Sequence, residues 1–511
     1  MYQPNSQPDN NRCDANVKTS ALSEYFYKIL FLSLALIVGC SDGSDFAGSS
    51  LSEVPEPSLV EQLPGEPLLG GPFFDGIGYE LSEYLVSGVA DSYTNVNELA
   101  SDGRWEIQPA ESLEYTTRIV VFRPSEPASF NGTVVVEWLN VSAGADSAPD
   151  WRLTHTELTR SGYAWVGVSA QERGVNALKS SDEEKYIPLN HPGDSFSYSI
   201  FSQVAKLIRS DQGKEILGDL DFKAILAAGE SQSASRLLSY VNALSIRDRM
   251  YDGYFIHSRY RSSAPLSQAP QPDIAAPEVV LVRDDIQVPA MMFQTESDVV
   301  TLGSYLNRQV DTDHFRLWEA AGTAHADYYV TVTTNSDMGD DPSVAAVFEN
   351  PLFCEKPVNM GPQHFVAKAA LSALNAWVVE GQEPAIADRL TVVESVPEQA
   401  RDQFGNARGG IRTPFVDAPL ATLSGEGNSG EGPIGGFCNR LFGTTKLLDA
   451  STLAARYADS DSYRAEVNES TDNAVAEGFL LSEDAVLIKE YASQVEIFDT
   501  QSGPEPEPEE E

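Results

Sequence analysis

Six short, nearly continuous apolar runs recur along the middle of the chain, and they constrain its fold more than any other feature. The runs are TVVVEWL (133–139), YAWVGV (163–168), FKAILAA (222–228), YDGYFIH (251–257), PAMMFQ (289–294) and FRLWEAA (315–321). Each has the length of one strand. Apolar residues on both faces are typical of parallel strands that are covered by helices on each side. The runs therefore predict a sheet that is mostly parallel.

Amphipathic segments lie between several of these runs. YSIFSQVAKLIRS (198–210) and SASRLLSYVNAL (233–244) carry apolar residues at steps of three and four, which predicts two helices. Strand, helix and parallel strand then form right-handed βαβ units. FFDGIGYELSEYLVSGVADSY (73–93) predicts antiparallel strands at the edge where the chain enters the sheet. The predicted fold class is α/β, a mostly parallel sheet flanked by helices.

The size and charge of the chain suit an enzyme and exclude one class of partner. The chain has 511 residues, of which 42% are hydrophobic, so it can build a large core. Its 34 basic and 76 acidic residues give a formal net charge of -42. Nucleic-acid binding draws its affinity from clustered Lys and Arg, and we therefore expect no nucleic-acid partner.

The N-terminal segment resembles an export signal. Lys18 and Lys28 precede the apolar run ILFLSLALIV (29–38), which is shorter than the roughly 20 residues of a membrane span and suits the core of a signal peptide. The run meets Ile37-Val38-Gly39-Cys40, which resembles a bacterial lipobox. This pattern predicts a signal peptide over 1–39, lipidation of Cys40, and export to the cell envelope, at the outer membrane or cell surface. An ordinary signal peptide or an uncleaved anchor are the alternatives.

The segments that flank the predicted domain are poor in periodic apolar residues. Residues 40–71 are rich in Ser, Pro, Gly and acids and predict a flexible tether. Residues 501–511 predict a disordered acidic tail. The folded domain is therefore expected over 72–500.

Four cysteines leave one candidate pair. Cys13 would be lost with the signal peptide and Cys40 would be acylated, which leaves Cys354 and Cys438. In an oxidising compartment an even pair predicts a disulfide. Two separate buried thiols remain the alternative, because the sequence does not show that the two Cα atoms come within about 7 Å.

Ser231 is the candidate nucleophile. It lies in Gly229-Glu230-Ser231-Gln232-Ser233, between a predicted strand and a predicted helix, where serine replaces the second glycine of G-x-S-x-G. A tight strand-to-helix elbow needs small residues two positions before and after the nucleophile, and Gly229 and Ser233 are small. The alternative is that Ser231 only caps the helix.

A serine nucleophile needs a base and an acid that orients the base. Glu296 and Asp298 follow the strand at 289–294, and His325 follows the next strand along the chain. On these residues alone, either Asp298 or Glu296 could be the acid. Since the carboxyl ends of parallel strands meet at one edge of a sheet, we expect Ser231, one of these acids and His325 to meet there.

An oxyanion hole uses two backbone N–H groups in this chemistry. One is expected at Gln232, and Asn140 and Val141 are candidates for the other. His257 and Arg259, in FIHSRYR, either line the pocket or serve as a core histidine and a loop arginine. No motif for zinc, dinucleotides or nucleoside triphosphates occurs, so we expect no metal and no cofactor.

Several motifs resemble one family. They are VVVEWLNVSAGAD (134–146), AAGESQSASRL (227–237), TESDV (295–299), RLWEAAGTAHAD (316–327) and GNARGGIRTPFVD (405–417). They look like the long bacterial α/β-hydrolase-domain proteins, and the likeness covers roughly residues 72–495. It implies an α/β-hydrolase fold in which Ser231 is the nucleophile, Asp298 the acid and His325 the base. It also implies hydrolysis without naming a substrate.

The chain continues well beyond His325, and residues from about 330 predict a C-terminal extension. HFVAKAALSALNAWVV (364–379), ASTLAARYA (450–458) and YRAEVNESTDNAVAEGF (463–479) predict helices. IRTPFVDAPLATLSG (411–425) is strand-like, and the Gly-rich SGEGNSGEGPIGG (424–436) predicts a surface loop.

The residues and the resemblance together predict a serine hydrolase, and specifically a carboxylester hydrolase that forms an acyl-enzyme on Ser231. Its partner would be a small-molecule ester. An acyltransferase and a non-catalytic, surface-anchored binding protein on the same fold are the alternatives, because fold alone does not fix function. Nothing in the sequence predicts an oligomeric state.

Overall fold

The computed structural model describes residues 54–345, 354–393, 395 and 397–497. The predicted signal peptide, Cys40 and the predicted acidic tail at 501–511 lie outside these residues. Within the described residues, no helix combines the length and the apolarity that a membrane crossing needs.

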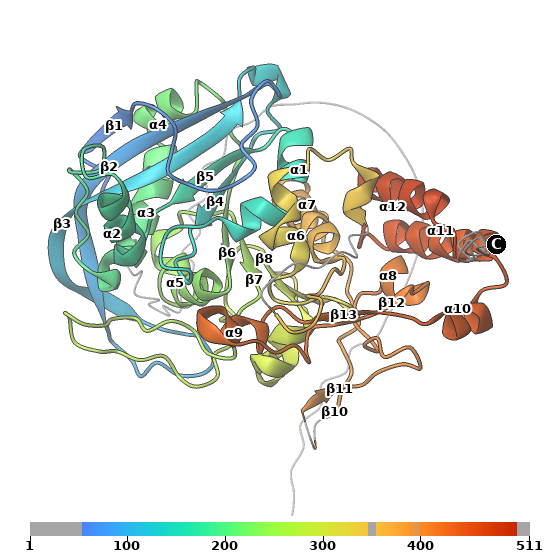
Figure 1. Ribbon diagram of the computed structural model, residues 1–511. Coiled ribbons are helices and arrows are strands. Elements are labelled where there is room, and N and C mark those ends of the chain that lie inside the picture. The colour runs from blue at the N-terminus through green and yellow to red at the C-terminus, as the bar shows by residue number, and fades with distance from the viewer. Residues whose placement is uncertain (1–53, 346–353, 394, 396, 498–511) are drawn as a thin grey trace, which may run out of the picture. The chain divides into compact units, whose positions relative to one another are not determined.

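A nine-stranded sheet forms the centre of this part of the chain, with the strand order β1-β2-β3-β5-β4-β6-β7-β8-β9 (Figure 1). The strands are β1 (Leu59–Leu63), β2 (Tyr79–Asn95), β3 (Ile107–Pro124), β4 (Thr133–Trp138), β5 (Ala164–Val168), β6 (Ala224–Glu230), β7 (Gly253–His257), β8 (Ala290–Gln294) and β9 (Phe315–Glu319). β1, β2, β3 and β5 pair antiparallel in turn, and β5, β4, β6, β7, β8 and β9 pair parallel. All six predicted parallel strands are thus confirmed.

Helices and short helical turns complete the fold. The helices are α1 (Pro149–Arg160), α2 (Glu172–Ser181), α3 (Ser197–Ile208), α4 (Asp211–Ile216), α5 (Gln232–Asp248), α6 (Tyr328–Thr331), α7 (Gln363–Glu380), α8 (Pro414–Asp417), α9 (Gly432–Cys438), α10 (Ala450–Arg456), α11 (Ser460–Ala476) and α12 (Ser482–Gln494). The short turns are η1 (Pro127–Ser129), η2 (Asp194–Phe196), η3 (Ser297–Thr301), η4 (Ser304–Asn307), η5 (Thr333–Asn335) and η6 (Pro342–Ala345).

Both faces of the sheet are covered, as the continuous apolar runs predict. In β6, Ile225 and Ala227 belong to one buried cluster with residues of α3 and α5, while Leu226 and Ala228 belong to a second cluster with residues of α1 and α7. Burying one such aliphatic side chain contributes about 1.5–3 kcal/mol. The two-sided burial explains why the parallel strands are mostly apolar. The predicted helices at 198–210 and 233–244 are confirmed as α3 and α5.

The start of the domain differs from the prediction. β1 pairs antiparallel with β2, from Leu59 opposite Ser87 to Leu63 opposite Glu83. The prediction of a flexible tether over 40–71 is therefore wrong for this strand. The local composition, rich in Pro and Glu, hides a pairing that depends on a partner strand distant in sequence.

The extension contains three of the predicted helices and two small sheets. The helices at 364–379, 450–458 and 463–479 are confirmed as α7, α10 and α11. The small sheets pair β10 (Val392–Val393) with β11 (Glu398–Gln399), and β12 (Ala421–Ser424) with β13 (Thr444–Leu447). The strand-like stretch at 411–425 is only partly a strand, because Pro414 starts α8 there. The Gly-rich segment predicted as a loop runs into α9.

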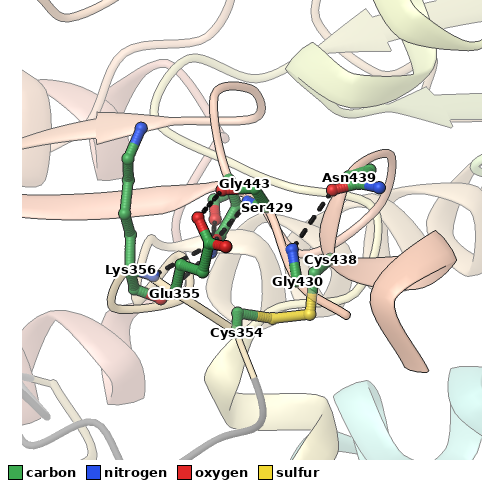
Figure 2. Close-up of a disulfide and its surroundings, with 9 residues drawn as sticks. Cys354, Glu355, Lys356, Ser429, Gly430, Cys438, Asn439 and Gly443 are labelled. Atoms are coloured by element: carbon green, nitrogen blue, oxygen red, sulfur yellow. Dashed lines mark hydrogen bonds between the residues drawn. A yellow bond between two sulfur atoms is a disulfide. The ribbon is translucent and has the colours of Figure 1, made fainter. Parts of the chain in front are cut away.

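The predicted disulfide between Cys354 and Cys438 is confirmed, with a Cα–Cα distance of 5.6 Å (Figure 2). It joins positions that are 84 residues apart and attaches the end of α9 to the chain around Cys354. The backbone N–H of Glu355 also donates to the carbonyl of Ser429 at 2.8 Å. The segment that carries α9 is therefore held by a covalent link as well as by a backbone hydrogen bond.

Candidate active site

Ser231 lies on a sharp turn between β6 and α5. Its φ of 59° and ψ of -116° are rare for a residue with a side chain, and such strain is typical of functional turns. The turn brings strand and helix so close that a Cβ on Gly229 would lie 3.0 Å from the carbonyl oxygen of Ser233. Position 229 therefore favours a residue without a side chain, in keeping with the small residue that the elbow motif predicts there.

Ser233 replaces the second glycine of that motif without disrupting the turn. Its hydroxyl is fully buried and donates to the carbonyl oxygen of Glu230 at 2.8 Å. The hydrogen bond satisfies the buried polar group inside the first turn of α5. The departure from the motif is accommodated by this bond.

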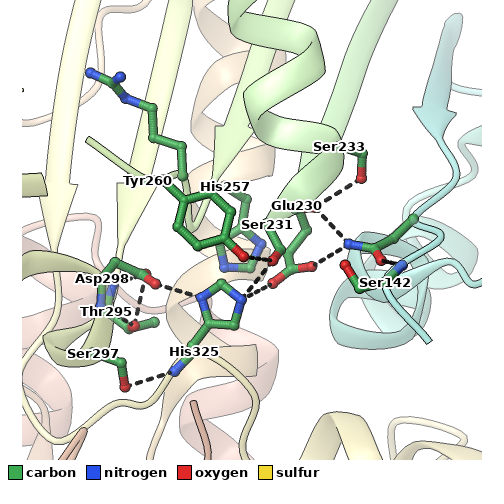
Figure 3. Close-up of polar contacts among 12 residues, drawn as sticks. Ser142, Glu230, Ser231, Ser233, His257, Tyr260, Thr295, Ser297, Asp298 and His325 are labelled. Carbon is green, nitrogen blue, oxygen red and sulfur yellow. Dashed lines mark hydrogen bonds and ion pairs between the residues drawn. The ribbon is translucent and has the colours of Figure 1, made fainter. Parts of the chain in front are cut away.

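The three residues of the predicted triad meet in one chain of hydrogen bonds (Figure 3). His325 Nε2 lies 2.7 Å from Ser231 Oγ, and His325 Nδ1 lies 2.6 Å from Asp298 Oδ1. Ser231 follows β6, Asp298 lies in η3 after β8, and His325 lies in the loop after β9. Adjacent parallel strands deliver these loops to the same edge of the sheet.

Asp298 is held as a carboxylate. Its Oδ2 accepts hydrogen bonds from the backbone N–H and the hydroxyl of Thr295, each at 2.7 Å. Burial raises the pKa of Asp298, but the charge and hydrogen bond of His325 and the two bonds from Thr295 outweigh it and leave the pKa below its ordinary value. The side chain can therefore orient His325 and balance a positive charge on it.

Glu296, the alternative acid, contacts other groups. Its carboxylate accepts from the N–H of Gly322 at 2.6 Å and of Gly425 at 3.1 Å, and lies 3.4 Å from Arg401. These contacts join the loop after β9 to the C-terminal extension. Asp298, rather than Glu296, is the acid that the fold brings to His325.

The backbone N–H groups predicted to form the oxyanion hole differ in whether they already donate a hydrogen bond. Gln232 is the first residue of α5, and neither its N–H nor that of Val141 meets an acceptor within the described residues. The N–H of Asn140 donates to the carbonyl of Ser147 at 2.8 Å, so the prediction of Asn140 as a backbone donor is wrong. Its side-chain Nδ2 instead donates to the carbonyl of Glu230 at 3.1 Å. The backbone N–H of Asn140 is occupied by a bridge to Ser147 across the loop, and no local sequence pattern indicates this bridge.

Two further residues adjoin the triad, and the sequence analysis did not assign them. Glu230 Oε1 lies 3.4 Å from His325 Nε2, and the hydroxyl of Tyr260 lies 3.4 Å from Ser231 Oγ. Burial, reinforced by the charges of nearby carboxylates, raises the pKa of Glu230 well above its ordinary value. The carboxyl therefore favours the uncharged form. Glu230 directly precedes Ser231 in the elbow pentapeptide, and this position in the sequence could have indicated that it lies at the site.

His257 and Arg259 do not line the pocket. The buried His257 ring lies 2.8 Å from Asp150 Oδ1 through Nδ1. The buried Arg259 donates to the carbonyl of Val280 at 2.7 Å, and burial lowers its pKa to about 9. Both act as core residues, and their neighbour Tyr260 reaches Ser231 instead.

A cavity of about 360 Å³ opens onto Ser231 and His325. Its other lining residues come from α1, α6, the end of β6, the loops after β4, β7 and β9, and the extension: Asn140, Ser142, Ala143, Ser147, Pro149, Arg152, Leu153, Glu230, Tyr260, Ala326, Val330, Thr331, Phe437, Leu441 and Phe442. The size and largely apolar lining are typical of small-molecule sites. Across the described parts of the chain, no cluster of three His, Cys, Asp or Glu side chains could hold a metal ion.

The mostly parallel sheet and the serine elbow define the class of protein as an α/β hydrolase by architecture. The chain belongs to the family described as alpha/beta hydrolase domain, whose model matches residues 55–490. The match confirms the predicted resemblance and fold class. No curated protein matches the sequence significantly.

Solved structures of esterases and hydrolases are also similar, at low identity. Acetyl xylan esterase 1 from Thermoanaerobacterium sp. JW/SL YS485 is 10% identical, with a TM-score of 0.28, and the alignment covers 52% of this chain and 81% of that one. A serine hydrolase without a lid from Xanthomonas campestris is 10% identical, with a TM-score of 0.26 and coverage of 45% and 83%. A carboxylesterase from Lactobacillus plantarum WCFS1 is 11% identical, with a TM-score of 0.24 and coverage of 40% and 71%.

Proposed function

We propose that the protein is a serine carboxylester hydrolase that acts through an acyl-enzyme on Ser231. The observation that carries this proposal is the hydrogen-bond chain from Ser231 through His325 to Asp298, which opens onto a cavity of about 360 Å³. A serine hydroxyl becomes an effective nucleophile only when a base accepts its proton, and His325 Nε2 is within reach of that proton.

Acylation starts when Ser231 Oγ attacks the ester carbonyl and its proton passes to His325 Nε2. The Asp298 carboxylate balances the charge on the histidine. The N–H groups of Gln232 and Val141 are the donors available for the developing oxyanion, and one such donor is worth about 3–4 kcal/mol. The alcohol then leaves with the proton from His325, and the acyl group stays on Ser231.

Deacylation repeats these steps with water as the attacking nucleophile. Water gives a proton to His325 Nε2 as its oxygen attacks the acyl carbon, and Ser231 leaves with that proton. The products are a carboxylic acid and the restored enzyme, so no cofactor is required.

Covalent labelling by a fluorophosphonate tests this proposal. The reagent should label the wild-type protein once, on the peptide that contains Ser231, and the Ser231→Ala variant should neither be labelled nor hydrolyse esters. Normal hydrolysis by Ser231→Ala would refute the mechanism. Absence of labelling and hydrolysis in the wild type would favour a binding protein. Transfer of the acyl group to an added alcohol, with the new ester formed faster than the carboxylic acid is released by water, would indicate an acyltransferase.

We also propose that the protein is exported and anchored to the cell envelope through a lipidated Cys40. The lipobox-like sequence before Cys40 supports this proposal. Cys40→Ala should move the protein from the membrane fraction to the soluble fraction without loss of esterase activity. Cys13→Ala, inside the predicted signal peptide, is the matched control and should leave the location unchanged. Membrane association of Cys40→Ala would refute the anchor.

A further inference from the structure

An arginine that forms no ion pair with any acid among the described residues lines the cavity at Ser231. Arg152 lies in the first turn of α1, and the polar contact of its guanidinium within the described residues is a hydrogen bond from Nη2 to the carbonyl of Gly70 at 3.2 Å. Its Nε is buried and has no partner in the described chain. A cation near a helix N-terminus is also disfavoured by the helix dipole. Burial lowers the pKa of Arg152, with Glu137 partly opposing the shift, and no carboxylate among the described residues forms an ion pair with this side chain.

Most arginines of the described chain form an ion pair with an acid, as expected because acids greatly outnumber bases. The described arginines that form no ion pair with a described acid are Arg152, Arg173, Arg249, Arg259, Arg408 and Arg440. Of this small set, Arg152 lines the cavity at Ser231. In a protein with a net charge of -42, a cavity-lining arginine that has no ion-pair partner among the described residues is therefore a notable feature.

Arg173 and Arg440 lie near segments that contribute to the cavity lining. A Cβ on Gly144, in the loop that contributes Ser142 and Ala143 to the lining, would lie 3.1 Å from Arg173 Nη2. Arg440 directly precedes the lining residue Leu441. Burial raises the pKa of Tyr260, and the charge of Arg440 partly opposes that rise, so the guanidinium acts on the cavity.

The acidic groups near Arg152 do not neutralise it. Glu230 is the one carboxylic acid among the described residues that line the cavity, and its raised pKa favours the uncharged form. Glu137 acts on Arg152 from inside the core, where burial and the charge of Asp150 raise its own pKa well above the ordinary value. The carboxylate of Glu137 is also bonded to Trp165 and to two backbone N–H groups. The cavity therefore presents a positive charge beside an apolar wall.

We propose that the substrate is an ester that also carries a carboxylate, and that Arg152 binds this carboxylate within the cavity. A guanidinium matches a carboxylate with two parallel N–H donors, which gives both affinity and orientation. The apolar wall then receives the carbon chain between the two groups. This inference rests on the proposed esterase function, and it adds the chemical class of the substrate.

Two matched ester pairs test the inference and distinguish where the charge sits. The first pair compares mono(4-nitrophenyl) glutarate with 4-nitrophenyl pentanoate, and the carboxylate of the charged ester lies on the acyl side. The second pair compares 4-acetoxybenzoate with its methyl ester, and the carboxylate lies on the alcohol side. The measured quantity is the ratio of kcat/KM for the charged ester to that for the neutral one. Arg152→Met should lower this ratio at least tenfold in one pair, and Arg152→Lys should lower it less. Arg408→Met, an exposed and unpaired arginine outside the cavity, should keep the wild-type ratio.

Binding of glutarate and benzoate to the full chain, measured by calorimetry, separates this inference from the esterase proposal because it needs no turnover. Arg152→Met should weaken binding of at least one anion tenfold relative to the wild type, and melting curves verify that the variant is folded. Absent binding, or unchanged ratios and affinities in Arg152→Met, would overturn the inference even if neutral esters are hydrolysed. Arg152-dependent binding without hydrolysis of any ester would refute the esterase proposal alone.

Discussion

Replacing Gly229 by alanine should displace Ser231 without removing any polar contact of the site. The added Cβ would lie 3.0 Å from the carbonyl oxygen of Ser233, 3.1 Å from its carbonyl carbon and 3.3 Å from the nitrogen of Ala234. All three are backbone atoms at the start of α5, so no flexible side chain can move aside. The helix start must therefore shift by a few tenths of an ångström.

The expected magnitude follows from this geometry. Forcing one extra methyl group into a close-packed region costs about 1–3 kcal/mol of stability. A misplacement of about 1 Å costs an active site roughly 100-fold, so a shift of some tenths of an ångström should slow the reaction of Ser231 about fivefold. Both effects should appear together, since one displacement causes them.

The assay is the rate of fluorophosphonate labelling of Ser231, combined with urea unfolding. Gly436→Ala is the matched control, because a Cβ at Gly436 meets no atom within 4 Å. This control should label and unfold like the wild type. If Gly229→Ala also did so, the close approach of β6 and α5 would not hold Ser231 in place, and the account of the elbow would be refuted.

Further predictions concern the acid, the disulfide and a buried carboxyl. Asp298→Asn should lower kcat by about 10⁴-fold, while Glu296→Gln should be mild, since of these two acids only Asp298 contacts His325; steady-state kinetics with one ester compares them. Replacing Cys354 and Cys438 together by alanine should cost about 2–4 kcal/mol in urea unfolding. The same double variant should raise KM, because Phe437 beside Cys438 lines the cavity. The raised pKa of Glu230 means that the folded state binds a proton that the unfolded state releases above about pH 4.3, so stability from this group falls as pH rises. Glu230→Gln should therefore lose less stability between pH 5 and 8 than the wild type, measured by urea midpoints at both pH values, and equal losses would contradict the buried, uncharged carboxyl.

The central strands and the meeting of the site loops are predictable from the sequence for a physical reason. A strand covered on both faces must be apolar at nearly every position, and that pattern is local. Since parallel strands align their carboxyl ends, the positions of Ser231, Asp298 and His325 after three strands suffice to bring them to one edge. Both predictions use only the local pattern of each strand and the order of the strands and loops along the chain.

Features that depend on one specific pairing partner, whether near or distant in sequence, were not predictable from local patterns. β1 is a strand because β2 pairs with it, and the N–H of Asn140 is occupied because Ser147 lies across a bridge in the same loop. Arg152 enters the cavity because α1 begins directly after that loop. The walls at Phe437 and Phe442 come from a segment more than 100 residues beyond His325, and no periodicity signals that it returns to the site.

The most direct test of the central claim is mass spectrometry of the protein quenched during turnover of 4-nitrophenyl acetate. The account predicts that one acetyl group appears on the peptide that contains Ser231, and that this adduct is absent from Ser231→Ala and accumulates little in His325→Ala. Turnover with no acylated peptide, or an acetyl group on another residue that persists in Ser231→Ala, would contradict the assignment of Ser231 as the nucleophile.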